Sequence, residues 1–128
     1  MGSEIITTRT GKVGLGEDGI LRGVSLSNAR MTLADAQENI AAGHAVDGGI
    51  ARPVLMDIRQ IQAIDWQARA FFASETSVAH SRAVALLIGT PVSRMIGNFF
   101  LVLNKPRVPL RLFTDEGEAI EWLKGFLP

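Results

Sequence analysis

Cysteine is absent from the 128 residues of this chain, which excludes disulfide bonds, thiolate catalysis and cysteine-based zinc sites. The two histidines lack the spacing of a metal-binding motif. Ser77, His80 and Ser81 cluster in the sequence, but without a G-x-S-x-G motif we expect no catalytic serine. Neither charge sign is in excess, because 13 basic residues balance 13 acidic residues. We therefore expect a protein without cofactor, metal or nucleic-acid partner.

Long hydrophobic runs are also missing. No apolar stretch is long enough to span a membrane, and the segment MGSEIITTRT has no apolar core of the kind found in signal peptides. We therefore expect a cytoplasmic protein without a membrane span. Hydrophobic residues nevertheless make up 47% of the chain, enough to build a buried core, and the length suits a single domain over residues 1–128.

The segment 83–113 predicts a strand, a helix and a second strand. Residues 83–88 form an apolar run that is typical of a strand buried on both faces. Thr90 can cap a helix and Pro91 suits its first position, so a helix is predicted over residues 91–103. The alternating sequence PLRLF then predicts a return to the sheet. A unit of this kind indicates an α/β fold.

Periodicity and turn residues predict the other elements. The predicted strands are residues 4–15, 20–26 and 53–58. The predicted helices are residues 32–46, residues 65–74 and a last segment that Thr114 caps. Thr32 and Asp35 are expected to form a capping box at the start of the first helix. In that last helix we expect Trp122 to be mostly buried. Residues 14–19 match G-x-G-x-x-G, but two acids lie within the match and a strand-like segment follows it. We interpret it as a hairpin turn.

Residues 54–68 resemble the STAS domain, the fold of bacterial anti-sigma-factor antagonists. In that family an apolar strand and a polar turn precede Asp-Ser-Ser-Gly, which opens the next helix. Asp65 matches the family aspartate, whereas Trp66 and Gln67 replace the two serines and Ala68 replaces the glycine. The resemblance therefore implies that the serine phosphorylated by a partner kinase is absent here.

Further motifs are similar to those of a group of stand-alone STAS-like bacterial proteins of unassigned function. These motifs are Ala68-Arg69-Ala70-Phe71-Phe72, Thr90-Pro91-Val92-Ser93-Arg94, Asn98-Phe99-Phe100, and Leu112-Phe113-Thr114-Asp115 through Trp122-Leu123. The resemblance implies a single STAS-like domain of the α/β class. We expect a central mixed sheet with helices packed mainly on one face, in the order β-β-α-β-α-β-α-β-α.

Four residues are candidates for contact with a ligand or partner: Asp57, Asp65, Trp66 and Arg69. Asp57 ends a predicted central strand, and ligands gather at this end of the strands in open α/β sheets. Asp65 lies at a predicted helix start. The alternative is that Asp57 caps a loop and Asp65 caps the helix.

The resemblance favours a non-catalytic protein, a regulatory or scaffolding domain that acts by protein interaction. The alternative is a binder of a small apolar, lipid-like ligand between helices and sheet, because lipid-transfer proteins of the CRAL-TRIO or SEC14 type have a related topology. A pocket of several hundred Å³ lined by Phe71, Phe72 and Phe99 would favour the ligand binder. A filled core with an apolar outer patch would favour the interaction domain.

The helix at residues 91–103 is also predicted to join copies of the chain as a homodimer or larger homo-oligomer. On a helical wheel, Val92 and Ile96 are expected to face the sheet. Ser93, Gly97 and Leu101 follow one another on the face away from the sheet, and Phe100 lies beside them. Gly97 weakens the helix, and a partner helix that approaches closely would give this glycine a purpose.

Overall fold

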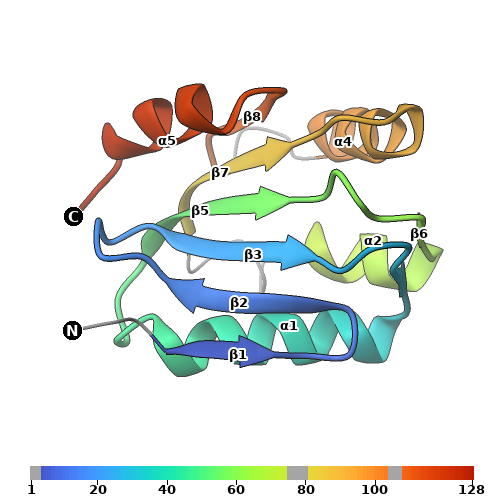
Figure 1. The fold of residues 1–128 in the computed structure, drawn as a ribbon, viewed down its shortest axis with the longest axis horizontal. Helices are drawn as coiled ribbons and strands as arrows, with labels where there is room; N and C mark the ends of the chain where they lie inside the picture. The colour runs from blue at the N-terminus through green and yellow to red at the C-terminus, as the bar shows by residue number, and fades with distance from the viewer. Residues whose placement is uncertain (1–3, 75–80, 104–107) are drawn as a thin grey trace.

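The computed structural model describes residues 4–74, 81–103 and 108–128 (Figure 1). Its strands are β1 (Ile5–Thr7), β2 (Gly11–Leu15), β3 (Leu21–Ser25), β4 (Arg30–Met31), β5 (Arg52–Asp57), β6 (Ala63–Ile64), β7 (Ser81–Leu87) and β8 (Leu110–Phe113). Its helices are α1 (Leu33–Val46), α2 (Trp66–Phe72), α4 (Pro91–Leu103) and α5 (Glu116–Lys124). The predicted α/β class is confirmed.

Six strands form one sheet in the order β1-β2-β3-β5-β7-β8. The strands β1, β2 and β3 pair antiparallel, whereas β3, β5, β7 and β8 pair parallel. The sheet is therefore mixed, as predicted, and β5 has a neighbour on each side. A separate ladder pairs β4 with β6 in parallel. These two strands have two residues each, too few for an alternating pattern to reveal them.

The predicted strand over residues 4–15 is wrong in one respect, because it is two strands that fold back on each other. In the turn between β1 and β2, the Thr8 N–H donates to the Gly11 carbonyl at 2.8 Å, and the Gly11 N–H donates to the Thr8 hydroxyl at 3.0 Å. The predicted turn before β3 is confirmed: Gly19 has a φ of 86°, and its N–H donates to the Gly16 carbonyl at 3.0 Å. The glycine-rich match is a hairpin turn.

Helices α1, α2 and α4 cover one face of the sheet, and α5 covers the other. On the first face, Ala36 of α1, Ala68 of α2 and Ile96 of α4 belong to one buried cluster. On the second face, Leu87 of β7 and Leu123 of α5 belong to another. The helices are therefore packed mainly on one face, as predicted.

The predicted orientation of α4 is right for Ile96, which is buried, but wrong for Ser93 and Gly97. Ser93 is completely buried, and its hydroxyl oxygen accepts hydrogen bonds from the N–H groups of Gly89 and Thr90, each at 2.9 Å. A Cβ atom added to Gly97 would lie 2.9 Å from Leu112 Cδ2. Both small residues therefore face the sheet, where they let the helix approach closely, and neither lies on an outer surface.

The other residues of α4 agree with this orientation. Phe100 packs against the buried cluster, whereas Leu101 is 42% exposed. Val92 was expected to face the sheet, but it is exposed together with Met95 and Val102. A helical wheel could not choose the inward side, because apolar residues lie on more than one side of this helix.

The last helix differs from the prediction in one detail, because its N-cap is Asp115 and not Thr114. Leu123 is fully buried. Trp122 is mostly buried, as predicted, and packs its ring against Phe113, with 5.6 Å between the ring centres. Both residues therefore dock the helix onto the sheet.

Candidate functional site

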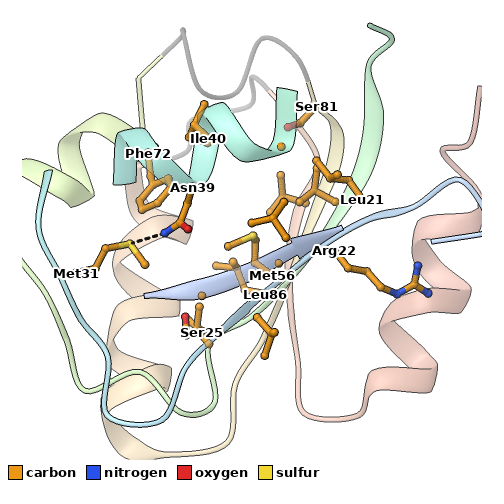
Figure 2. A pocket seen from close by; sticks show the side chains of 18 of the residues that line it. Leu21, Arg22, Ser25, Met31, Asn39, Ile40, Met56, Phe72, Ser81 and Leu86 are labelled. Carbon is orange, nitrogen blue, oxygen red and sulfur yellow. Dashed lines mark hydrogen bonds between the residues drawn. The ribbon is translucent and has the colours of Figure 1, made fainter. Parts of the chain in front are cut away.

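An apolar cavity lies between the sheet and the three helices that cover one of its faces (Figure 2). Its volume is about 180 Å³. Met56 of β5 and Leu86 of β7 line it from the sheet, and Ile40 of α1, Phe72 of α2 and Phe100 of α4 line it from the helices. An apolar cavity of about 150 Å³ in another protein binds benzene. The space here is therefore large enough for a compact apolar molecule.

Small residues where α1 crosses the sheet help to keep this space open. Gly43 of α1 lines the cavity, and a Cβ atom added there would meet Leu21 Cδ2 at 3.4 Å, an ordinary contact distance. Gly23 of β3 also lines it, and the Met56 thioether lies in the space above, 2.9 Å from the position of an added Cβ. Larger residues at these two positions would fill part of the cavity.

One end of the cavity, which we call the closed end, is bounded by buried apolar residues. These are Met31, Ile58, Ile61 and Ile64, each at most 6% exposed. Ser25, the last residue of β3, lies at this end, is 5% exposed and lines the cavity. Within the described part of the chain, its hydroxyl group makes no hydrogen bond.

Asn39 of α1 contributes an amide near the same end. Its Nδ2 donates to Thr10 Oγ1 at 3.0 Å and lies 3.9 Å from Met31 Sδ. Its Oδ1 accepts from the Thr8 hydroxyl at 2.5 Å. The amide is therefore fixed by contacts to the β1–β2 turn and, unlike the Ser25 hydroxyl, has its partners within the protein.

The opposite end of the cavity is more exposed. Ser81 starts β7 and lies at this end, because β3 and β7 run in the same direction and Ser25 ends β3 (Figure 2). His44 lines this end, is exposed, and places its Nδ1 3.4 Å from Asp47 Oδ2. Solvent therefore reaches the lining residues from this side.

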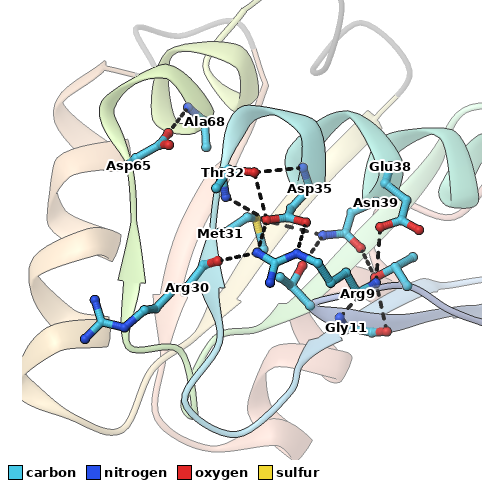
Figure 3. Close-up of polar contacts among 12 residues, drawn as sticks. Arg9, Gly11, Arg30, Met31, Thr32, Asp35, Glu38, Asn39, Asp65 and Ala68 are labelled. Atoms are coloured by element: carbon cyan, nitrogen blue, oxygen red, sulfur yellow. Dashed lines mark hydrogen bonds and ion pairs between the residues drawn. The ribbon is translucent and has the colours of Figure 1, made fainter.

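An ion pair fixes the start of α1 beside the closed end (Figure 3). Arg9 Nε donates to Asp35 Oδ1 at 2.6 Å, and Arg9 Nη2 donates to the second carboxylate oxygen and, at 2.8 Å, to the Arg30 carbonyl. Asp35 also accepts from the Thr32 N–H at 2.8 Å, which completes the predicted capping box. The hydrogen-bonded Arg9 guanidinium holds the pKa of Asp35 well below its usual range, although burial acts to raise it.

The two predicted aspartates do not form one site. Asp57 pairs with Arg59, whose Nη2 lies 2.7 Å from Asp57 Oδ2 and whose backbone N–H donates to Asp57 Oδ1 at 3.0 Å. Asp65 is the N-cap of α2 and accepts from the Ala68 N–H at 2.8 Å. Both carboxylates thus make the loop and capping contacts that the sequence left open as the alternative.

The other two predicted residues lie outside the cavity lining. Trp66 is 71% exposed at the first position of α2. Arg69 Nε donates to the Ile64 carbonyl at 2.9 Å, and its guanidinium carbon lies 5.0 Å from the centre of the Phe99 ring. Arg69 therefore joins α2 to α4, and Trp66 presents an aromatic surface to solvent.

The cluster of Ser77, His80 and Ser81 is described only at Ser81, because Ser77 and His80 lie outside the described residues.

Within residues 4–74, 81–103 and 108–128, no three histidine, aspartate or glutamate side chains are placed to hold a metal ion. No helix in those ranges has the length and apolar character needed to cross a membrane.

The sequence interpretation missed Ser25 and Asn39. A signal for Ser25 was present in the alternation of β3. Leu21, Gly23 and Ser25 share one face of this strand, and Gly23 and Ser25 stand where large apolar residues would be expected on a buried face. No comparable signal marked Asn39, since its role depends on the docking of α1 onto the β1–β2 turn.

A solved structure with a similar fold is that of an uncharacterized DUF3478-family protein from Shewanella loihica PV-4, described as having a SpoIIAA-like fold. The two structures superpose with a TM-score of 0.59 at 16% identity, over 95% of this chain and 92% of that chain. At this identity the likeness shows the fold alone. The STAS-like fold expected from the sequence is thereby confirmed.

The chain is also similar in sequence to a protein with unknown function from Arthrobacter sp. FB24. The identity is 32% over 92% of this chain and 95% of that chain, with a TM-score of 0.33. No curated protein matches the chain. A family model described as "Domain of unknown function (DUF7793)" matches residues 15–127. The chain therefore belongs to this DUF7793 family.

Proposed function

We propose that this protein is a non-catalytic binding domain that holds a small apolar molecule between its sheet and helices α1, α2 and α4. The observation that carries the proposal is the apolar cavity of about 180 Å³. Protein cores normally contain few voids larger than a water molecule. An empty apolar space of this size lowers stability, so a molecule that fills it would be bound.

The size of the cavity favours a compact ligand over a lipid chain. Its volume is below the several hundred Å³ named above as favouring a ligand binder, and of the three phenylalanines named there only Phe72 lines it, together with Phe100. Its volume is close to that of the benzene-binding cavity of about 150 Å³. A single ring with one or two small substituents matches this space, and the lipid-like ligand of the sequence-based alternative does not.

The polar groups around the cavity support binding without chemistry. A serine nucleophile needs a base within hydrogen-bond reach. Ser25 has no hydrogen-bond partner in the described part of the chain, and His44 lies at the opposite end of the cavity. The Asn39 amide is held by Thr8 and Thr10.

Titration with toluene, followed by two-dimensional amide NMR, tests the proposal. We expect toluene to shift the amide signals of cavity residues and to saturate. Val84→Phe should abolish the effect, because Val84 of β7 lines the cavity and a phenyl ring would fill it. Val92→Phe is the matched control, because Val92 is exposed on α4 outside the lining.

Native mass spectrometry of the freshly purified protein adds an independent test, since a retained small molecule would appear as extra mass. If toluene causes no saturable shifts and the protein carries no retained molecule, the binding proposal is wrong.

A second candidate function is a regulatory or scaffolding role through self-association. The exposed apolar residues Val92, Met95, Leu101 and Val102 on α4 favour it. This surface replaces the interface proposed from the sequence, because Ser93 and Gly97 face the sheet. Burial of these side chains in a dimer would contribute about 25 cal/mol per Å² of apolar surface.

Light scattering at tens of micromolar tests this second candidate. We expect a dimer or larger oligomer that Val102→Glu dissociates. Ile50→Glu is the control, because Ile50 is an equally apolar and 45% exposed residue that lies outside α4. A monomeric wild-type protein would exclude the candidate.

A further inference from the structure

Ser25 gives the cavity a chemical preference in addition to its shape. The residue is 5% exposed, so its hydroxyl group is largely shielded from bulk water. It lines the cavity at the closed end and has no hydrogen-bond partner in the described part of the chain. Figure 2 shows it at the end away from Ser81.

No fully buried side-chain oxygen of the described residues lacks a partner, so the unpaired Ser25 oxygen keeps some accessible surface. A hydroxyl group that faces an apolar cavity gains from a hydrogen-bonding partner there. The neighbouring polar groups do not serve Ser25, because Asn39 is used by Thr8 and Thr10. The other residues that bound the closed end are apolar, Met31 and Ile58 among them. A molecule that occupies the cavity and displaces water from the Ser25 oxygen is therefore favoured if it supplies a hydrogen bond itself.

The charged residues near the cavity are already paired or lie elsewhere. Arg9 and Asp35, beside the closed end, form an ion pair with each other. Lys12 pairs in register with Val24, so its exposed side chain is on the sheet face opposite to Ser25.

Arg22 pairs with Asp18 through two hydrogen bonds of 2.8 Å, and in Figure 2 its guanidinium points away from the cavity. Asp47 lies at the opposite end, where its Oδ1 accepts from the Gly49 N–H at 2.7 Å. A charged ligand group at the closed end would be buried without a counter-ion, which is strongly unfavourable. The ligand group that meets Ser25 must be neutral.

We propose that the ligand is a neutral, compact molecule with an apolar body the size of one ring and one hydroxyl or carbonyl group that hydrogen-bonds to Ser25. This inference rests on the proposed binding function and specifies the ligand class. Phenol and toluene are suitable probes, because they have nearly the same shape and differ in one hydroxyl group.

The experiment measures the dissociation constants of both probes by NMR titration, for the wild-type protein and for Ser25→Ala. Water hydrates phenol better than toluene, so the phenol-to-toluene affinity ratio of one protein alone does not report on Ser25. The informative quantity is the change in this ratio from the wild-type protein to Ser25→Ala. We expect the phenol-to-toluene affinity ratio to fall about tenfold in Ser25→Ala, which is the effect of one lost hydrogen bond. Toluene should bind the variant at least as tightly as the wild type.

Ser81→Ala is the matched control, because Ser81 also lines the cavity but at its other end. It should leave the affinity ratio unchanged. Toluene binding confirms in each variant that the cavity is folded. If Ser25→Ala does not fold, Ser25→Cys replaces it, because a thiol is a much weaker hydrogen-bond donor of similar size.

The outcomes separate the two proposals. If both probes bind the wild type and Ser25→Ala leaves their ratio unchanged, the Ser25 inference is wrong while the binding function stands. If neither probe binds the wild type and native mass spectrometry finds no retained molecule, the binding function itself fails. A ratio that falls equally in Ser81→Ala and Ser25→Ala would also overturn the role assigned to Ser25.

Discussion

The orientation of α4 can be tested by the same substitution in two helices. Gly43 lies inside α1 and Gly97 lies inside α4, so replacement by alanine gains about 1 kcal/mol of helix propensity at each position. The surroundings differ. An added Cβ atom would meet Leu21 at 3.4 Å in the first case, but Leu112 at 2.9 Å and Ile88 at 3.3 Å in the second.

The expected free energies follow from these contacts. Gly43→Ala should raise the free energy of unfolding by about 1 kcal/mol, because the added methyl group meets Leu21 only at an ordinary contact distance of 3.4 Å. For Gly97→Ala, overpacking of a core typically costs about 1–3 kcal/mol, which offsets the propensity gain. We therefore expect this variant to range from unchanged to about 2 kcal/mol less stable, so that the two variants differ by about 1–3 kcal/mol.

Urea unfolding monitored by circular dichroism measures both values. In a Leu112→Ala background, Gly97→Ala should recover its propensity gain, because the main clash is removed. If Gly97→Ala instead stabilises the wild-type protein as much as Gly43→Ala does, Gly97 faces solvent. The helical-wheel orientation would then be right, and the packing of α4 described above would be wrong.

Three further predictions concern stability and modification. The Arg9 guanidinium lowers the pKa of the Asp35 carboxyl group in the folded state. The ionised carboxylate therefore stabilises the fold above about pH 4, and this stabilisation is lost as the pH falls below that value. The stability difference between wild type and Asp35→Asn, measured by urea unfolding, should therefore shrink in acid; a constant difference from pH 7 to pH 2 would contradict this. Leu123→Ala should cost about 2–5 kcal/mol and more than Trp122→Ala, because Leu123 is fully buried whereas Trp122 keeps part of its surface exposed; the reverse order in urea unfolding would show that the tryptophan is the main anchor of α5. Incubation with anti-sigma kinases and ATP should leave residues 65–74 unmodified, as mass spectrometry would show, because Trp66 and Gln67 replace the family serines; stoichiometric phosphate there would refute the prediction.

The sequence determined the parts of the fold that depend on neighbouring residues. The strand, helix and strand within residues 83–113 follow from an apolar run, a Thr-Pro helix start and an alternating segment. The Thr32–Asp35 capping box and the turn at Gly19 were predicted for the same reason, since each is a local hydrogen-bonding or backbone requirement. Together these signals were sufficient for the α/β class and the STAS-like fold.

The sequence was less informative wherever two arrangements satisfied the same local pattern. Apolar residues on several sides of α4 left its inward face undecided, and the contact of Gly97 with Leu112 decides it. Asp57 and Asp65 were compatible with a shared site, but each is occupied by its own loop or helix.

Only the tertiary structure decided where the candidate site lies. The cavity arises because α1 docks at a fixed height above β2 and β3, held by the Arg9–Asp35 ion pair and the Asn39 hydrogen bonds. These contacts join residues that lie about thirty positions apart along the chain. Local periodicity reports which face of an element is apolar, but the volume left between two apolar faces depends on how far apart packing holds them.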